Sequence, residues 1–345
     1  MQVPVVCAPM AYGTTANLVT QVTNGGGFAF VPAGYGTVRQ LREELTAVRS
    51  LLKSSGQSYS IRLPVGVGYF GWKLEEDVDE AHAMLDAALQ AGVRAVWLAF
   101  GQNLGRWAEY VRESDKSTGR KTLIFILVNS VEEALTAVND WNADVVVAQG
   151  NEAGGHGGNY APPTYSLVSS ILAALPPGGP PVLAAGGITN GAQIAGYIAL
   201  GAGGAALGTR FLLTPESMYT GPQKAALLIA DANSTVRTKA FDQARDKLGW
   251  PNWINGRGIR NKLVEDVENG KDISEVKEKL AEAVQHGMSD YMVIFAGIGA
   301  ADCRDLVEAQ EVVKELYQDI MQRLRTIESI FIEPKVVKQE PDYLW

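Results

Sequence analysis

Short apolar runs recur through the first two-thirds of the chain, each bounded by glycine, proline or polar residues. The eight runs are VPVVCAPM (3–10), FAFVPAG (28–34), IRLPVGVGYF (61–70), AVWLAFG (95–101), TLIFILVN (122–129), DVVVAQG (144–150), PPVLAAGGI (180–188) and AALGTRFLL (205–213). They are nearly continuous and do not alternate with polar residues, which is typical of parallel strands covered on both faces. We therefore predict one strand in each run.

The segments between these runs are long enough to hold one helix each. Residues 38–53 and 75–91 have a helical composition, and Ser130 followed by Glu133 forms a capping-box pattern at the start of another helix. Eight strand–helix alternations predict an α/β fold of the closed (β/α)8, or TIM-barrel, type. A doubly wound open sheet can be drawn from the same alternation and is the alternative architecture.

The pattern changes after the eighth run. Residues 215–300 are richer in charge and include a helix-like stretch at 272–285. Apolar residues then recur in steps of three and four over 302–330, which predicts the amphipathic eighth helix of the barrel. We therefore divide the chain into a barrel, residues 1–214 and 301–345, and a mainly helical insertion, residues 215–300. Since βα connections emerge at the C-terminal face of a barrel, we expect the insertion to cover the active-site mouth as a lid.

Composition excludes several classes of function. The net charge is −8 and there is no long basic run, so a nucleic-acid partner, which requires clustered Lys and Arg, is not expected. No apolar stretch is long enough to cross a bilayer and the first residues lack a signal-peptide pattern, so we predict a soluble cytoplasmic protein with no membrane partner. Cys7 and Cys303 are the only cysteines and indicate neither a disulfide framework nor a zinc site; Cys7 is expected to be a buried thiol.

Glycine-rich segments follow several of the predicted strands. Gly186 and Gly187 precede a predicted helix start, and Gly208 and Thr209 lie about twenty residues further on. Barrels frequently bind a phosphate group with the loops after strands seven and eight, where glycines let backbone N–H groups approach the anion. The sequence therefore predicts a phosphate-bearing cofactor at these residues.

The segment QGNEAGGHGG (149–158) ends the sixth predicted strand. Its glycines let the backbone lie against a flat ligand, and His156 then stands beside that ligand with a titration range that suits proton transfer. We interpret Glu152 as orienting His156 or a loop amide, with a solvated loop acid as the alternative. His82 and His286 are interpreted as structural, and neither a Ser–His–Asp set nor a metal site is predicted.

Several of these segments closely resemble the nitronate monooxygenase family, formerly called 2-nitropropane dioxygenases. The segments that carry the resemblance are QGNEAGGHGG (149–158), PVLAAGGI (181–188), ALGTRF (206–211), APM (8–10), FAGIGA (295–300), RTKAF (237–241) and GRGIRN (256–261). The segment GVGYFGW (66–72) resembles the form found in a fungal branch. The resemblance implies an FMN-binding barrel that oxidises alkyl nitronates with O2 to a carbonyl compound and nitrite.

The resemblance also implies roles for individual residues. His156 matches the proposed catalytic base of the family. The residues that match flavin or phosphate contacts are Ala8, Pro9, Met10, Gln149, Gly154, Gly155, Gly186, Gly187, Ala206, Leu207, Gly208 and Thr209. Two positions depart from the bacterial pattern, which has Gln where this chain has Ala206 and Asn where it has Gly68. Neither residue can supply the side-chain amide found in those relatives.

We therefore predict an FMN-dependent oxidoreductase that acts on alkyl nitronates, or on nitroalkanes once His156 has removed the α-proton, with O2 as second substrate. One alternative is an FMN-dependent NAD(P)H enoyl-thioester or quinone reductase, because that family has a similar strand-six loop, although with Glu at the position of Gln149. Another is a flavin-holding protein without turnover. The expected partners are small molecules, with a homodimer as the candidate assembly; the sequence fixes neither the oligomeric state nor the physiological substrate.

Overall fold

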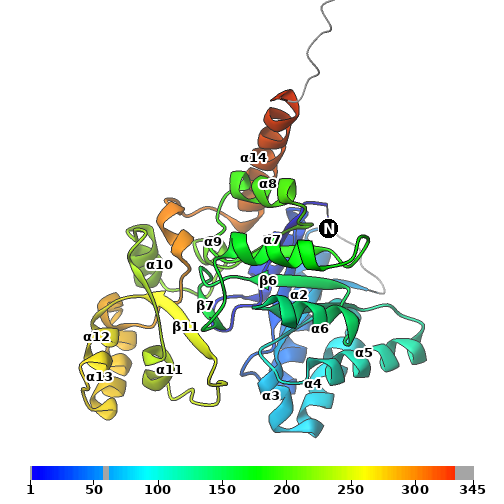
Figure 1. Ribbon diagram of the computed structural model, residues 1–345. Coiled ribbons are helices and arrows are strands. Elements are labelled where there is room, and N and C mark those ends of the chain that lie inside the picture. Colours follow the sequence, from blue (N-terminus) through cyan, green and yellow to red (C-terminus); the bar gives the residue numbers. More distant parts are fainter. Residues whose placement is uncertain (1, 57–61, 331–345) are drawn as a thin grey trace, which may run out of the picture.

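The computed structural model describes residues 2–56 and 62–330. Eight parallel strands form a closed barrel in chain order, and the last strand returns to the first through the pair Val6 and Ala206. The barrel strands are β1 (Val5–Cys7), β2 (Phe28–Pro32), β3 (Leu63–Phe70), β4 (Val93–Ala99), β5 (Leu123–Val128), β6 (Val145–Gln149), β8 (Val182–Ala185) and β9 (Gly204–Leu207). Closure confirms the predicted (β/α)8 barrel and excludes the open sheet (Figure 1). Ile61, which begins the third predicted strand, lies outside the described residues.

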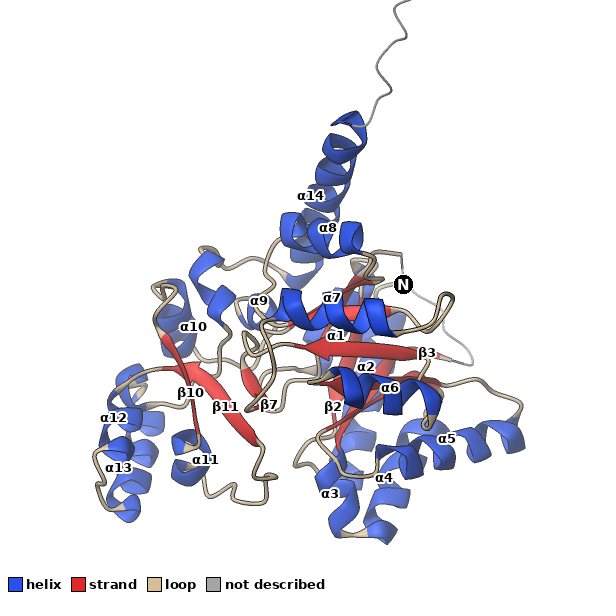
Figure 2. Cartoon of the chain, viewed as in Figure 1, coloured by secondary structure: helices blue, strands red, loops and turns tan. Residues whose placement is uncertain are grey.

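Helices surround the barrel strands (Figure 2). They are α1 (Ala16–Asn24), α2 (Val38–Ser54), α3 (Gly71–Glu76), α4 (Val78–Gln90), α5 (Leu104–Thr118), α6 (Val131–Asn139), α7 (Thr164–Ala174), α8 (Gly191–Leu200) and α14 (Ala309–Ile330). The single helix predicted over 75–91 is interrupted, because Asp77 has extended backbone and caps α4 with its side chain. Ser130 caps α6 as predicted, whereas Glu133 accepts from the N–H of Asn129 and not from that of Ser130.

Side chains fill the interior of the barrel. Phe30, Trp97 and Phe125 form the centre of this packing, with ring centroids 5.1 to 6.2 Å apart. Aliphatic side chains on the other face of the same strands pack against the surrounding helices, and Cys7 is fully buried among them as predicted. Each strand is thus covered on both sides, which explains why the apolar runs are continuous in the sequence.

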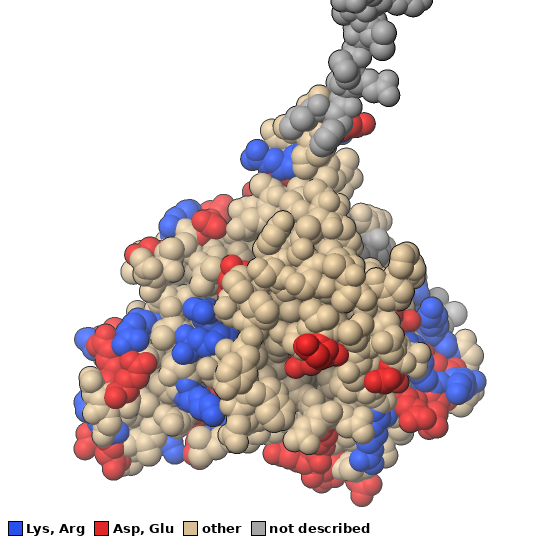
Figure 3. Space-filling model, in the orientation of Figure 1, with Lys and Arg blue, Asp and Glu red and all other residues tan. Residues whose placement is uncertain are grey.

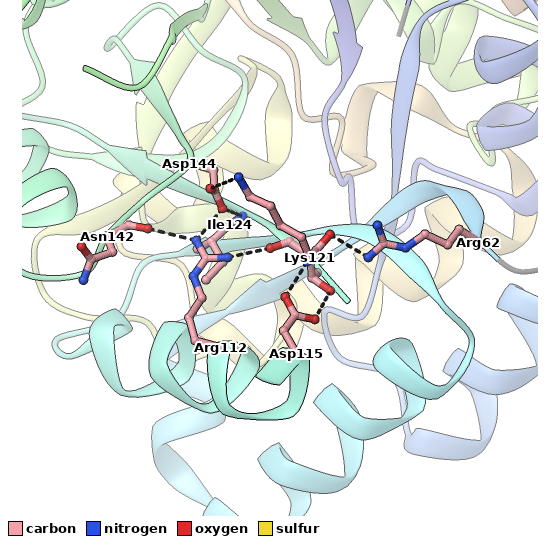
Figure 4. Close-up of polar contacts among 8 residues, drawn as sticks. Arg62, Arg112, Asp115, Lys121, Ile124, Asn142 and Asp144 are labelled. Carbon is pink, nitrogen blue, oxygen red and sulfur yellow. Dashed lines mark hydrogen bonds and ion pairs between the residues drawn. The ribbon is translucent and has the colours of Figure 1, made fainter. Parts of the chain in front are cut away.

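A polar network joins α5 to the N-terminal ends of β5 and β6 (Figure 4). Arg112 donates to the carbonyls of Thr122 and Asn142 and forms an ion pair with Asp144. Asp144 also accepts from the N–H of Ile124, at 2.8 Å. In this fold the N-terminal end of the barrel serves stability, and functional groups gather at the opposite end.

The segment between β9 and α14 packs around an apolar core of its own. It contains α9 (Thr209–Leu212), α10 (Gly221–Leu228), β10 (Thr235–Thr238), α11 (Ala240–Ala244), β11 (Ile254–Ile259), α12 (Lys262–Glu268) and α13 (Ile273–His286). The two strands were not predicted from the sequence. They form an antiparallel sheet with β7 (Gly155–Gly158), which lies within the strand-six motif.

The chain then returns to the barrel. The amphipathic helix predicted from residue 302 begins at Ala309 and packs against α8 and α1, the place of the eighth barrel helix. The division into residues 1–214 with 301–345 and residues 215–300 stays a prediction, and residues 331–345 lie outside the described part of the chain.

The surface has one broad uncharged area. Between residues 153 and 209 the sequence contains no Asp, Glu, Lys or Arg, and this stretch includes α7 and α8. Figure 3 shows the corresponding face, with charged residues of both signs gathered at its two sides. Within residues 2–56 and 62–330, no helix combines the length and apolar character needed to span a membrane.

Candidate active site

His156 lies on β7, at the junction of the barrel and the segment that follows β9. Its backbone is opposite Gly256 of β11. From the barrel side, Gln149 at the end of β6 donates through Nε2 to the carbonyl of His156, at 3.1 Å. Asn129, after β5, donates to Oε1 of Gln149 and accepts from the N–H of Gly158. The ends of two barrel strands therefore fix the backbone that carries the histidine.

The imidazole of His156 is enclosed by side chains from the segment after β9. Its Nε2 lies 2.8 Å from Oδ1 of Asp242, on α11. Its ring stacks on Trp250, with centroids 3.6 Å and planes 9° apart, and lies 5.3 Å from the ring of Phe295. Since an ionised carboxylate only accepts hydrogen bonds, Nε2 carries the proton and Nδ1 keeps its lone pair. The pair thus fixes the tautomer and leaves Nδ1 as the nitrogen that can accept a proton.

Opposing effects act on the pKa of His156. Burial lowers this pKa below its ordinary value, whereas the hydrogen bond and charge of Asp242 raise it. The positive charges of Arg245 and Arg237 lower it further. The net direction is downward, so the imidazole is neutral at pH 7, which is the form that acts as a base.

A cavity of about 130 Å³ opens beside His156. The predicted site residues that line it are Pro9, Met10, Gly154, Gly155, His156 and Thr209. The other lining residues include Tyr12, Tyr35, Phe70, Phe100, Tyr219, Arg245 and Phe295. A second cavity of about 70 Å³, almost entirely apolar, shares Pro9, Phe70 and Phe100 with the first and adds Ala8, Gly68 and Trp97.

Three glycines predicted to hold a phosphate have amides without a partner among the described residues. Gly186 and Gly187 have φ values of +113° and +73°, which favour glycine. A Cβ on Gly186 would lie 2.9 Å from the nitrogen of Ala153, so a side chain there would push the loop after β8 away from the strand-six loop. In the described part of the chain, the N–H groups of Gly186, Gly187 and Gly208 donate no hydrogen bond to another residue. Free amides of this kind are the donors that a phosphate requires, so these residues fit the phosphate of FMN.

Three predicted cofactor residues have side chains engaged elsewhere. The amide of Gln149 is buried and bonded at both ends to the protein. The side chain of Ala206 packs inside the barrel, and that of Leu207 packs in the core between strands and helices. For Leu207 only the backbone is available to a ligand at the mouth. The assignment of these residues as cofactor contacts stays a prediction.

Gly68, where the bacterial pattern has Asn, lies directly against the side chain of Pro9. A Cβ at this position would lie 2.4 Å from Cγ of Pro9. The ring of Pro9 therefore occupies the space into which an Asn side chain would project, and both residues line the apolar cavity. An aromatic and aliphatic surface takes the place of the amide.

Of the roles left open for Glu152, the structure supports the orientation of a loop amide. Glu152 accepts from the N–H of Thr164 at the start of α7, at 2.9 Å, so it orients a loop amide and not the histidine. Asp242 and Trp250, which contact the imidazole, were missed. The only signal for Asp242 was its position directly after the family segment RTKAF (237–241).

A closed (β/α)8 barrel whose mouth combines a buried His–Asp pair with free glycine amides has the features of a cofactor-dependent barrel enzyme. The family model of nitronate monooxygenase matches residues 73–319, and the chain belongs to this family of oxidoreductases. The nitronate monooxygenase npaC of Metarhizium robertsii is 31% identical over 327 residues, which cover 90% of this chain and 89% of that protein. The nitronate monooxygenase of Neurospora crassa is 27% identical over 348 residues, 94% and 91% of the two chains. These fungal relatives confirm the family and agree with the fungal-like segment at 66–72.

Solved structures extend the comparison. A nitroalkane oxidase from Streptomyces ansochromogenes superposes with a TM-score of 0.76 and 27% identity, covering 94% of this chain and 97% of its own. FabK from Thermotoga maritima superposes with a TM-score of 0.75 over 96% of both chains, at 22% identity, and shows the shared fold. The predicted barrel fold is confirmed by both.

Proposed function

We propose that this protein binds FMN and oxidises alkyl nitronates with O2 to a carbonyl compound and nitrite. In the overall balance, two nitronate ions and one O2 give two carbonyl molecules and two nitrite ions. The observation that carries the proposal is the His156–Asp242 pair beside a pocket that Gly154 and Gly155 of the strand-six loop line. The relatives named nitronate monooxygenase and the neighbour described as a nitroalkane oxidase support this substrate class.

The residues that would hold FMN come from the strand ends of the barrel. The phosphate would be bound by Gly186, Gly187, Gly208 and Thr209, and the ring system by Ala8, Pro9, Met10, Gly154 and Gly155. Bound FMN would supply the redox chemistry by accepting electrons from the nitronate. The protein contributes the surface that orients the two partners and the groups that control protons.

His156 is the group that would move a proton. A nitronate ion has already lost its α-proton, whereas a neutral nitroalkane has not. For the neutral substrate, Nδ1 of His156 would take the α-proton, and the carboxylate of Asp242 would stabilise the imidazolium that forms. Trp250 covers one face of the ring and limits its access to water.

The test is to purify the protein, identify the chromophore released on denaturation, and measure nitrite formed from an alkyl nitronate in air. We expect a yellow protein that releases FMN, and nitrite formation that depends on both nitronate and O2. Release of FAD, or a colourless protein that FMN does not reconstitute, would overturn the cofactor. Rapid anaerobic bleaching by NADH or NADPH without nitrite formation would identify the reductase alternative.

A further inference from the structure

Among the described residues, Arg245 is a cation in the pocket without an acidic partner. It follows α11 directly and lines the pocket beside His156. Its guanidinium carbon lies 4.5 Å from the ring centre of Tyr12 and 5.8 Å from that of Phe295. It forms no ion pair with any residue in the described part of the chain. A guanidinium held between aromatic rings keeps its N–H edge available for a ligand.

The absence of a pair with Asp242 is informative. Residues three apart on a helix lie on one face, where an Asp and an Arg ordinarily attract each other. Asp242 instead directs Oδ1 to Nε2 of His156, at 2.8 Å. The carboxylate of Asp242, on α11, therefore contacts the histidine, and the guanidinium of Arg245, directly after α11, is left to face the pocket.

The position of Arg245 is close to the reacting group. Its charge lowers the pKa of both His156 and Tyr219, and Phe295 contacts the imidazole as well as the guanidinium. Burial raises the pKa of Tyr35 and Tyr219, two tyrosines that line the pocket, so neither adds a negative charge there. Arg245 is thus the one charged side chain among the described residues that line the pocket, where Asp242 does not appear.

We propose that Arg245 binds the two oxygens of the nitronate group and so makes the site selective for the anion over the neutral nitroalkane. The inference rests on the proposed function, because it assigns a residue to that substrate. The two oxygens of a nitronate lie in one plane and share the negative charge, as in a carboxylate. A guanidinium matches this arrangement with two parallel N–H donors and stays charged at every working pH.

The experiment is a calorimetric titration of nitrite, which also has two oxygens on one nitrogen, into the FMN-loaded protein. The variants are Arg245→Gln and Arg245→Lys. Arg106→Gln is the matched control, because Arg106 also lies over an aromatic ring, 5.0 Å from Trp107, but is exposed on α5 away from the pocket. FMN content and melting temperature check that each variant is folded.

We expect Arg245→Gln to weaken nitrite binding about 10- to 100-fold, the effect of losing hydrogen bonds between charged groups. Arg245→Lys should recover part of the affinity, and Arg106→Gln should match the wild type. KM for a nitronate should rise with the nitrite dissociation constant, while KM for a neutral nitroalkane changes little. Wild-type affinity in Arg245→Gln, or no nitrite binding to the wild type, would overturn the assignment.

A measurement on the wild-type protein covers the case in which the variants do not fold. Phenylglyoxal modifies accessible arginines, and nitrite should slow the modification of Arg245 but not that of Arg106, as followed by peptide mass mapping. Equal rates with and without nitrite would overturn the assignment.

Nitrite binding that depends on Arg245 in a protein that forms no nitrite from nitronate would overturn the proposed reaction alone. Normal turnover with unchanged nitrite binding in Arg245→Gln would overturn the present inference alone.

Discussion

The barrel and the segment after β9 contribute different kinds of groups to one pocket. The barrel contributes glycine backbone and uncharged side chains, such as Pro9 and Phe70. The later segment contributes the charges of Asp242 and Arg245 and the indole that covers the histidine. His156 lies where the two meet, since β7 follows a barrel strand but pairs with β11. In the proposed function, the barrel would provide the surface for a flat cofactor, while the segment after β9 would set the charge and hydration of the reacting groups.

This division teaches where specificity can change. A cofactor held through backbone amides depends little on side-chain identity, so the barrel mouth can be kept while the chemistry varies. Substitutions in the insertion should then alter the substrate and the pH dependence, whereas substitutions in the glycine loops should remove the cofactor. Variants on each side of the pocket test the comparison.

The largest effect is expected from Gly208→Asp, on the barrel side. A Cβ at this position meets only the side chain of Met10, at 3.4 Å, so the barrel should fold. Two like charges about 4 Å apart at an effective dielectric of about 20 repel by about 4 kcal/mol, so FMN affinity should fall about 10³-fold. Fluorescence titration of FMN measures this, with Gly208→Ala as the uncharged control that should bind nearly normally. Unchanged affinity in the Asp variant would place the phosphate elsewhere.

The second effect is expected at His156, where the barrel and the segment after β9 meet. His156→Asn keeps a polar side chain, so FMN should stay bound. General-base catalysis contributes about 10²- to 10⁴-fold, so oxidation of neutral nitroalkanes, where the wild type performs it, should fall by that factor. Oxidation of a pre-formed nitronate should fall less, because its α-proton is already absent. An equal loss on both substrates would show that His156 is not a carbon-acid base, and no loss on either would remove it from the mechanism.

The same comparison explains how far the sequence could be read. Each barrel strand is buried on both faces, so its apolar run is visible locally, and the glycines of the mouth follow those runs directly. The strand β11 reads INGRGI and is ordered by its partners β10 and β7, which no local pattern reveals. Glu152, four residues from His156, was only one candidate partner for the imidazole, and the observed partner, Asp242, lies 86 residues further along the chain. A long-range pair of this kind is determined by tertiary packing alone.

Asp242→Asn tests the charge that the insertion supplies. The carboxylate raises the pKa of His156, so its neutral replacement should lower that pKa further. The acid limb of kcat/KM for a neutral nitroalkane should therefore move to lower pH. The plateau should fall about 10- to 100-fold, because the charged hydrogen bond to the imidazolium is lost. A pH–rate profile measures both, and a limb that moves to higher pH would contradict the assigned role of Asp242.

The smallest effect is expected from Trp250→Leu, which tests how the insertion excludes water. Burial is the largest cause of the lowered pKa of His156, and the indole covers its ring at 3.6 Å. Removing the indole should let water reach the imidazole and raise its pKa toward the ordinary value. More of the histidine is then protonated at acidic pH, so activity on a neutral nitroalkane falls there and changes little at alkaline pH.

The acid limb of kcat/KM for Trp250→Leu should move to higher pH, opposite to the shift for Asp242→Asn. The two variants therefore separate the effect of charge on the pKa of His156 from the effect of hydration. Trp250→Phe is the control, since it keeps an aromatic face and loses only the hydrogen bond from Nε1 to Oη of Tyr35, at 2.9 Å. That variant should leave the limb in place and lower the free energy of unfolding by about 1 kcal/mol. If the limbs of Trp250→Leu and Asp242→Asn move in the same direction, the indole does not keep water from His156, and other neighbours of the ring, such as Phe295, must set the burial of the imidazole.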